Sequence, residues 1–336
     1  GSINKFSIFG EGRFWTPKAS HFFYLGYSLL MWTIDKEQSD SINTCGRNTF
    51  CFTETVLDGK IKCTLDIDEA LTFSDRVIMA IPTQFEREVC IKIAKSGFNS
   101  GHMLNLAKGI EIASGSLLHK IHAEICPDFI YSALSGPSHA EEVLIGCPTA
   151  VALASFTEGE AESWQKILTG NNFRVYTSDD VIGLEVGGAT KNIYAVAAGI
   201  SKAMKLGDNA LAAIACRGLA EIMRFGHKMG ASPLTLSGLA GVGDLMVTCY
   251  SMHSRYFSLG LAIGEGRTLD EAAQALGQVA EGAYTVRAVV ENSKKFDVEM
   301  PLAEGVYRIL YGGENPDKIL RELFARPLKA EMRFSN

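Results

Sequence analysis

Lys191 is the residue of this sequence whose surroundings most favour chemistry. It is the one charge in the stretch 186–200, where glycine, alanine and aliphatic residues predominate. Because burial disfavours an ammonium group, such a lysine either pairs with an anion or has a lowered pKa that suits proton transfer. The alternative is a lysine whose stem lies on apolar surface while its ammonium group reaches water.

Other segments carry residues that bind polar substrates. Lys108 follows a short apolar run, and the glycine-dense segment 238–249 presents Asp244 and Thr248 one helical turn apart. Ser254 precedes Arg255, whose guanidinium suits bidentate contact with a phosphate. Taken singly, Lys108 could lie in a surface turn, Asp244 could cap a helix, and Arg255 could be a solvated charge.

The segment Ser135-Gly136-Pro-Ser138-His-Ala140-Glu141 has the pattern of a turn between a strand and a helix. Ser138 and Glu141 have the spacing of a capping box. The free backbone amides of such a turn would suit a phosphate or a carboxamide, although the turn could be purely structural.

Gly10-Glu-Gly12 directly follows the first apolar run and precedes a helical stretch, as in a dinucleotide-binding loop. Trp15 occupies the third glycine position of that pattern, and Pro17 removes a backbone donor close to the helix start. Asp35 follows the second run, where a carboxylate would bind the ribose hydroxyls. Positions 33 and 34 hold no Arg or Lys, which favours NAD, while Lys36 leaves NADP possible.

These residues need elements that bring them together, and the first half of the chain predicts a sheet. Short apolar runs alternate with segments of helical length, which favours a mostly parallel sheet covered by helices on both faces. Pro82 closes the third run at the carboxyl end of a strand, where such sheets bind ligands. The expected strands are 6–9, 29–32, 76–81, 103–106, 129–134 and 149–154.

The second half predicts helices only. Ser178 is expected to cap a helix that runs through Ala198, and Asp208 opens another that runs through Arg224. Further helix starts are expected at Ser232-Pro233, at the capping box Thr268–Glu271 and at Asn315-Pro316. The predicted architecture is α/β: a Rossmann-like, doubly wound dinucleotide-binding domain over 1–178 and an all-helical substrate domain over 179–336.

Composition limits the possible partners. The chain has 336 residues, of which 47% are hydrophobic and 21% charged, and its net charge of −6 argues against a nucleic-acid groove or a polybasic membrane surface. The longest apolar run, 22–32, is too short to span a bilayer, and the opening residues lack the order of a secretory signal. Eight scattered cysteines predict reduced thiols in a cytoplasmic protein, and no metal is indicated. His119 and His122 read as one helix face.

The motifs together, in this order, resemble NAD(P)-dependent glycerol-3-phosphate dehydrogenase over nearly the whole chain. The resemblance implies hydride transfer between a nicotinamide cofactor and C2 of dihydroxyacetone phosphate or sn-glycerol 3-phosphate. It runs through the glycine loop, Lys108-Gly, Ser-Gly-Pro-Ser, Gly-Gly-Ala-Thr-Lys-Asn (187–192), Gly-Leu-Ala-Gly-Val-Gly-Asp-Leu (238–245), Ser-Arg, Val279-Ala-Glu281-Gly and Met-Pro-Leu (300–302).

The resemblance also implies roles for single residues. Lys191 would be the general acid/base at the C2 oxygen, Lys108 would add positive charge, and Asp244 would orient the lysine. The implied substrate-binding residues are Gly136, Ser138, Asn192, Thr248, Ser254, Arg255 and Tyr256. The implied cofactor-binding residues are Gly10, Gly12, Arg13, Phe14, Asp35, Lys108, Ala140, Arg255, Val279 and Glu281. A homodimer is expected from the apolar helical domain.

Two departures from the family pattern leave an alternative open. The family has glycine where this chain has Trp15, and it reads Ser-Arg-Asn where this chain has Ser254-Arg255-Tyr256. Tyrosine offers one hydroxyl on a bulky ring in place of the donors and acceptors of an amide. The alternative is a catalytically impaired descendant that keeps the fold and still binds a dinucleotide or phosphometabolite. Another hydroxyacid dehydrogenase with a helical second domain fits less well, because of the segment from Asp244 to Arg255.

Overall fold

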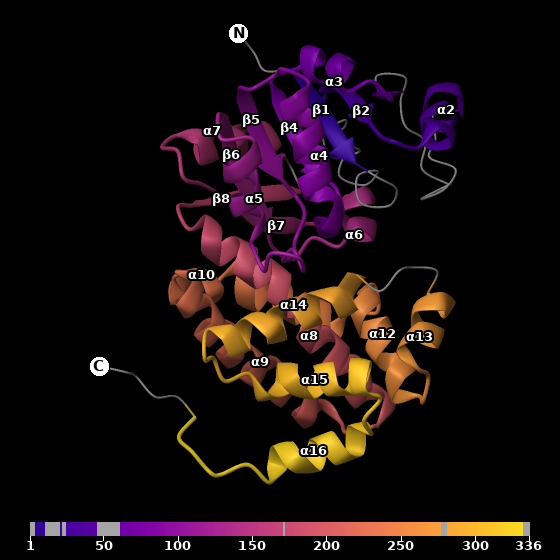
Figure 1. The fold of residues 1–336 in the computed structure, drawn as a ribbon, viewed down its shortest axis with the longest axis vertical. Coiled ribbons are helices and arrows are strands. Elements are labelled where there is room, and N and C mark those ends of the chain that lie inside the picture. The colour runs from indigo at the N-terminus through magenta and orange to yellow at the C-terminus, as the bar shows by residue number, and fades with distance from the viewer. Residues whose placement is uncertain are drawn as a thin grey trace.

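A single large sheet occupies the N-terminal part of the chain in the computed structural model (Figure 1). The structure describes residues 4–10, 21, 25–45, 61–170, 172–276 and 281–331. Over these residues the sheet has eight strands in the order β3-β2-β1-β4-β5-β6-β7-β8, and every neighbouring pair is parallel except β6 and β7. The strands are β1 (Lys5–Gly10), β2 (Ser28–Trp32), β3 (Ile61–Thr64), β4 (Arg76–Ala80), β5 (Gly101–Asn105), β6 (Phe129–Ser135), β7 (Thr149–Ser155) and β8 (Phe173–Ser178).

Helices cover both faces of this sheet, which confirms the predicted α/β class. Side chains of β4 alternate between two cores: Ile78 packs in one, and Val77 and Met79 pack in the other. Trp164 contributes to the first core from α7, and Cys90 contributes to the second from α4. The helices of this part are α2 (Lys36–Cys45), α3 (Ile67–Phe73), α4 (Thr83–Lys95), α5 (Leu118–Ile125), α6 (Ala140–Leu144) and α7 (Glu160–Leu168).

The six predicted strands are present, and two further strands were not predicted. Strand β3 has four residues with Lys62 exposed, and β8 exposes Arg174 and Tyr176 between its buried positions. Both lie at the edges of the sheet, and each has positions that are exposed to solvent. Edge strands therefore lack the continuous apolar run that identified the central ones.

Helices follow the sheet up to residue 324, as predicted, but the helices that begin near residues 180 and 208 have different bounds from the predicted ones. Helix α8 is capped by Asp180, which accepts from Gly183 N, so the expected cap at Ser178 is wrong. It continues beyond Ala198, because no breaker interrupts its apolar sequence. The helices are α8 (Val181–Ala203), α9 (Asp208–Met229), α10 (Pro233–Leu236), the π-helix η2 (Leu239–Gly243), α11 (Asp244–Tyr250), α12 (Arg255–Gly264), α13 (Leu269–Ala275), α14 (Glu281–Lys295), α15 (Pro301–Gly312) and α16 (Pro316–Phe324).

The other helix signals vary in accuracy. The capping box at Thr268 and Glu271 is present, with both reciprocal hydrogen bonds. Asn315 caps α16, and Pro233 occupies the first turn of α10. Helix α9 starts at the expected Asp208 but runs past Arg224, and it ends where Gly230 adopts the left-handed conformation.

Helix α8 lies at the centre of the helical part, and its own glycine allows a close crossing with α12. A Cβ on Gly199 would lie 2.1 Å from Phe257 O, and one on Gly260 would lie 2.0 Å from Val196 O. Both contacts are with backbone atoms, which cannot move aside without separating the helices. The sequence of small residues in α8 therefore reflects helix packing as well as chemistry.

Replacing Gly260 by alanine is expected to lower the free energy of unfolding by about 3 kcal/mol, because the new methyl group forces α8 and α12 apart. Thermal or urea unfolding measures this change. Gly312→Ala is the matched control, because its Cβ would meet only ordinary contacts with Glu314. Equal stability of Gly260→Ala and the wild type would contradict the close crossing.

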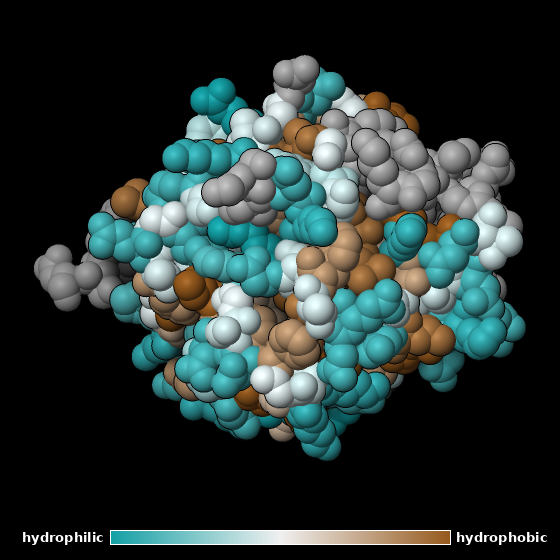
Figure 2. All heavy atoms as spheres, turned by 90° about the horizontal axis from the view of Figure 1, so that it is seen from above, coloured by the Kyte–Doolittle hydropathy of each residue, from teal (hydrophilic) through white to brown (hydrophobic). Residues whose placement is uncertain are grey.

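Seen from the sheet end, hydrophobic side chains lie in small groups among hydrophilic ones (Figure 2). Within the described residues, no helix is long and apolar enough to cross a membrane. Six cysteines of the described part are free thiols, and Cys63, Cys90, Cys126 and Cys249 among them are buried.

Candidate active site

Three charged side chains from distant segments meet where the sheet adjoins the helical part. Lys191 Nζ lies 2.5 Å from Asp244 Oδ1, and Lys108 Nζ lies 2.9 Å from Asp244 Oδ2. The Asp244 side chain is only 1% exposed, and those of Lys191 and Lys108 are 11% and 19% exposed. The Lys191 ammonium group is therefore buried and paired with a carboxylate, and it does not extend into water.

The three side chains come from the turn after β5, from α8 and from the start of α11. Lys108 lies in the turn after β5, at the carboxyl edge of the sheet. Asp244 is the first residue of α11, and its carboxylate contacts the lysines instead of capping the helix. Gly188 of α8 makes room for Lys108, since a Cβ there would lie 3.1 Å from both Cγ and Cδ of that side chain.

The electrostatics of this cluster suit proton transfer near neutral pH. Burial lowers the pKa of Lys191 to about 8; the charge of Lys108 acts in the same direction, and Asp244 opposes it. Burial alone would raise the pKa of Asp244, but the two ammonium groups outweigh burial and hold that pKa below its usual range. Asp244 therefore stays ionised, while Lys191 can exchange a proton with a bound oxygen.

The Ser135–Ala140 turn supports Lys108 through its backbone. Gly136 O accepts from Lys108 Nζ at 3.1 Å and from Ser138 Oγ at 3.0 Å. The capping box expected at Ser138 and Glu141 is wrong: α6 begins after His139, with no side-chain cap, because Ser138 turns back to Gly136. Ala140 is the first residue of α6.

Ser135 and His139 are two polar residues beside the cluster that sequence reasoning did not single out. Within the described residues, the buried Ser135 Oγ and His139 Nε2 make no hydrogen bond. Burial and the charge of Lys191 lower the pKa of His139. Serine and histidine are common residues in turns, so the sequence alone did not indicate a role for Ser135 or His139.

Asn192 and Thr248 lie next to the charged cluster. Asn192 follows Lys191 in α8, and its side chain is buried. Thr248 lies one turn after Asp244 in α11, as predicted, and its hydroxyl donates to Asp244 O at 2.6 Å. The Thr248 oxygen keeps acceptor capacity for a ligand.

The segment 254–256 begins α12. Ser254 caps the helix by accepting from Phe257 N at 3.2 Å, and Arg255 is its partly buried first residue. Tyr256 packs against the apolar core of the helical part. That packing gives the bulky ring a place at the position where the family pattern has asparagine.

The cofactor-binding prediction lies only in part within the described residues. Gly10 ends β1 and pairs with Ala80 of β4, so it lies at the carboxyl edge of the sheet. Asp35 follows β2, and its Oδ1 accepts from Gln38 N at 3.1 Å at the start of α2. Glu281 opens α14, but its side chain is outside the described part. Gly12, Arg13, Phe14, Trp15, Pro17 and Val279 also lie outside the described residues.

Two family models match this chain. The N-terminus of NAD-dependent glycerol-3-phosphate dehydrogenase matches residues 5–161, and the C-terminus matches residues 180–321. The chain belongs to the NAD-dependent glycerol-3-phosphate dehydrogenase family. The resemblance inferred from the motifs is therefore confirmed, together with the class of enzyme, an oxidoreductase dependent on NAD or NADP.

Individual members of the family are similar along the whole chain. The glycerol-3-phosphate dehydrogenase (NAD(P)+) of Staphylococcus aureus strain JH9 is 40% identical over 332 residues, which is 98% of this chain and 100% of that protein. The crystal structure of the Coxiella burnetii glycerol-3-phosphate dehydrogenase has a TM-score of 0.92 at 34% identity, covering 96% of this chain and 99% of that one. The Plasmodium falciparum structure shares the fold, with a TM-score of 0.86 at 20% identity over 98% and 97% of the two chains.

Proposed function

We propose that this enzyme reduces dihydroxyacetone phosphate to sn-glycerol 3-phosphate, and catalyses the reverse oxidation, with Lys191 as the proton-transfer group. The observation that carries the proposal is the Lys108–Asp244–Lys191 cluster, in a chain that belongs to this dehydrogenase family. The product would supply the synthesis of glycerophospholipids. The sheet region, to about residue 178, would bind the cofactor, and the helical region would bind the substrate.

In the direction of reduction, Lys191 donates a proton to the C2 oxygen as the carbonyl carbon gains hydride. The balanced reaction consumes one ketone, one reduced nicotinamide and one proton, and it yields the alcohol and the oxidised cofactor. Asp244 holds the lysine chain in place and stays ionised. Lys108 adds a second positive charge, which stabilises the negative charge that develops on the oxygen.

The remaining polar groups would position the substrate. The buried Asn192 amide would bind a substrate hydroxyl, and Thr248 would accept a hydrogen bond beside it. Arg255 would bind the phosphate from the start of α12. We also propose four further substrate contacts: Gly136, Ser138, Ser254 and Tyr256. The hydrogen bonds and packing that the structure gives these residues stabilise the turn before α6 and the start of α12.

The residues present fit a dinucleotide. Strands β2, β1 and β4 are parallel, so Asp35 and Gly10 lie at the same edge of the sheet, where such cofactors bind. A bound nicotinamide cofactor would supply or accept the hydride. Gly10, Asp35, Lys108, Ala140 and Arg255 would hold it, together with Gly12, Arg13, Phe14, Val279 and Glu281.

We propose that NAD is preferred and NADP is possible. Asp35 keeps one carboxylate oxygen for ribose hydroxyls, and a carboxylate there would repel a 2′-phosphate. The adjacent Lys36, which could bind such a phosphate, pairs with Asp40 at 2.9 Å. Titration with both reduced cofactors tests this preference, and a lower KM for NADPH than for NADH would contradict it.

The pH dependence of both directions follows from the pKa of Lys191. Below about pH 8 the group is an ammonium ion that can donate, and above it the group is an amine that can accept. We therefore expect kcat/KM for ketone reduction to fall as the pH rises through about 8, and kcat/KM for alcohol oxidation to rise over the same range. Initial rates between pH 6 and 10, followed at the absorbance of NADH, measure both profiles. A reduction rate that is flat across pH 8 would contradict the role of Lys191.

The same assay separates the enzyme from the catalytically impaired descendant. Oxidation of NADH that depends on dihydroxyacetone phosphate supports the dehydrogenase, whereas cofactor binding without turnover supports the impaired form. Trp15 and Tyr256 are the two departures that raised this alternative, and Trp15 lies outside the described residues. The matches to named dehydrogenases over the full chain favour the active form.

We also propose a cytoplasmic homodimer. The free thiols of the described part agree with a reducing compartment. The helical part exposes large apolar side chains, among them Leu234 and Phe324, which a second copy could cover. Light scattering at several protein concentrations would give the mass, and a monomer throughout would contradict the dimer.

A further inference from the structure

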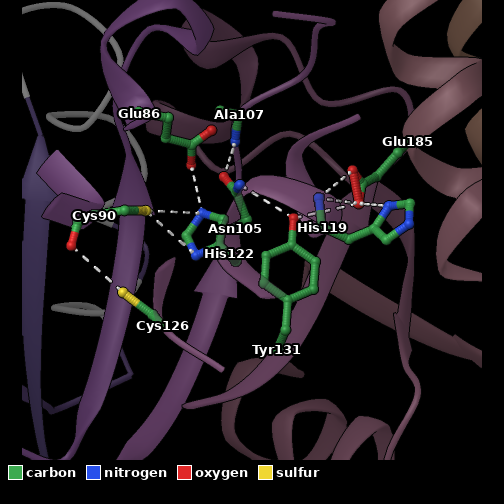
Figure 3. A network of polar contacts seen from close by, with 9 residues as sticks. All are labelled: Glu86, Cys90, Asn105, Ala107, His119, His122, Cys126, Tyr131 and Glu185. Atoms are coloured by element: carbon green, nitrogen blue, oxygen red, sulfur yellow. Dashed lines mark hydrogen bonds and ion pairs between the residues drawn. The ribbon is translucent and has the colours of Figure 1, made fainter. Parts of the chain in front are cut away.

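A buried hydrogen-bond network connects the turn that carries Lys108 to the helix that carries Lys191 (Figure 3). The Tyr131 hydroxyl is its central atom. It accepts from Asn105 Nδ2 at 3.2 Å and donates to Glu185 Oε1 at 3.4 Å. One oxygen therefore joins the end of β5 to α8 through a side chain of β6.

On the sheet side, Asn105 shapes the turn before Lys108. It is the last residue of β5, is 1% exposed, and its Oδ1 accepts from Ala107 N at 2.9 Å. That bond fixes the backbone immediately before Lys108. The other end of the Asn105 amide donates to the Tyr131 hydroxyl, so this hydroxyl helps to hold the side chain that shapes the Lys108 turn.

On the helix side, Glu185 anchors α8 to the sheet domain. Its Oε1 accepts from the backbone N and from Nδ1 of His119, both at 3.0 Å, as well as from Tyr131. Glu185 is buried and lies six residues before Lys191, about 9 Å along a helix axis. A rigid helix transmits the position of one to the other.

We propose that Tyr131 is a positioning residue for the proton transfer of Lys191: its hydroxyl holds the Lys108 turn against α8, so that both lysines contact Asp244 in one geometry. The proposal rests on the proposed function of Lys191. Burial raises the pKa of Tyr131 well above its ordinary value, and the Glu185 and Glu86 carboxylates act in the same direction. The hydroxyl therefore keeps the proton that the bond to Glu185 needs.

The consequence is electrostatic. Lys108 lowers the pKa of Lys191, and Asp244 raises it. If the turn loosens, Lys108 moves away from Asp244 and from Lys191. Lys191 then loses the repulsion from the Lys108 charge and becomes the sole ion-pair partner of the Asp244 carboxylate. Both changes raise the pKa of Lys191. The other titratable groups that face Lys191 are His139 from the turn before α6 and Cys249 from α11, and the network contacts neither of them.

Tyr131→Phe tests the proposal, and Tyr194→Phe is its matched control. Tyr194 lies on α8 and, like Tyr131, donates to a buried glutamate, since its hydroxyl is 2.9 Å from Glu221 Oε1. Each substitution removes one hydroxyl that is bonded to a buried carboxylate, so both are expected to lose about 1–2 kcal/mol of stability. Among the described contacts of these hydroxyls, only those of Tyr131 lead to the Lys108 turn.

The expected result is a change in pH profile rather than in stability alone. For Tyr131→Phe, the midpoint at which ketone reduction falls should move up by about half a pH unit, and kcat should fall roughly fivefold. For Tyr194→Phe, the midpoint should stay at the wild-type value. Coincident midpoints for Tyr131→Phe and the wild type, or an equal shift in both variants, would overturn the proposal.

A second measurement does not depend on activity. Reductive methylation with ¹³C-formaldehyde labels the lysines of the intact protein, and the Lys191 signal is assigned by its loss in Lys191→Met. NMR titration should place that signal at a higher pKa in Tyr131→Phe than in the wild type or in Tyr194→Phe. If the wild type does not reduce dihydroxyacetone phosphate, the proposed function fails, while an unchanged titration overturns the positioning role alone. Should Tyr131→Phe not fold, Asn105→Ala is expected to show the same upward shift, and its absence overturns the proposal.

Discussion

Replacing Lys191 by methionine is expected to lower kcat for the reduction of dihydroxyacetone phosphate by roughly a thousandfold, because the variant loses both the proton donor and the charge that stabilises the developing alkoxide. KM for NADH should change little. Methionine matches the length of the lysine stem, and Asp244 keeps its second partner, Lys108, at 2.9 Å. The free energy of unfolding should therefore stay within about 1 kcal/mol of the wild type.

Steady-state kinetics and urea unfolding on the same preparations measure these effects. Lys202→Met is the matched control, because Lys202 lies in the last turn of the same helix and is exposed. A Lys191→Met variant that keeps more than about a tenth of the wild-type kcat would exclude the lysine as the essential acid. Partial recovery of Lys191→Ala by added small amines would separate a missing proton donor from a distorted site.

The sequence alone predicted the residue types of the site and their local spacing. Lys191 was identified because no other charge occurs in 186–200, and Asp244 and Thr248 because a helix places them one turn apart. What it could not predict is that Lys108 and Lys191 both contact the carboxylate of Asp244. That contact joins a turn after β5 to two helices far along the chain, and no local pattern encodes it.

The errors in the predicted fold have a similar origin. Central strands were identified by their apolar runs, whereas β3 and β8 at the edges were missed. Ser178 and Ser138 both had cap-like spacing, but Asp180 caps α8 and the Ser138 hydroxyl bonds to Gly136. Tertiary neighbours decide between such alternatives, because several polar side chains close in sequence can satisfy the same backbone group.

Replacing Asp244 by asparagine should have the second large effect, and it tests the electrostatics of the cluster rather than the proton donor. The amide leaves two neighbouring ammonium groups without a counterion, so the pKa of Lys191 should fall further below its wild-type value of about 8. At pH 7.5 a smaller fraction of Lys191 then carries the proton that reduction needs, and its chain loses the 2.5 Å bond that holds it. We expect kcat/KM for reduction to fall roughly a hundredfold at that pH, with the decline of the profile moved to lower pH.

Stability should fall as well, and its pH dependence has a definite sign. Because the folded-state pKa of Asp244 is lowered, its stabilisation is present above the unfolded-state pKa and is lost as the pH falls through the folded-state value. At neutral pH, Asp244→Asn should lose about 3 kcal/mol of unfolding free energy, because one partner of a buried ion cluster is removed. The difference from the wild type should narrow in acid, where the wild type protonates the same carboxylate. The control is Asp208→Asn, at an exposed position in the first turn of α9, which should change neither kcat/KM nor the free energy of unfolding.

If the pH profile of Asp244→Asn coincides with that of the wild type, the carboxylate does not set the proton affinity of Lys191.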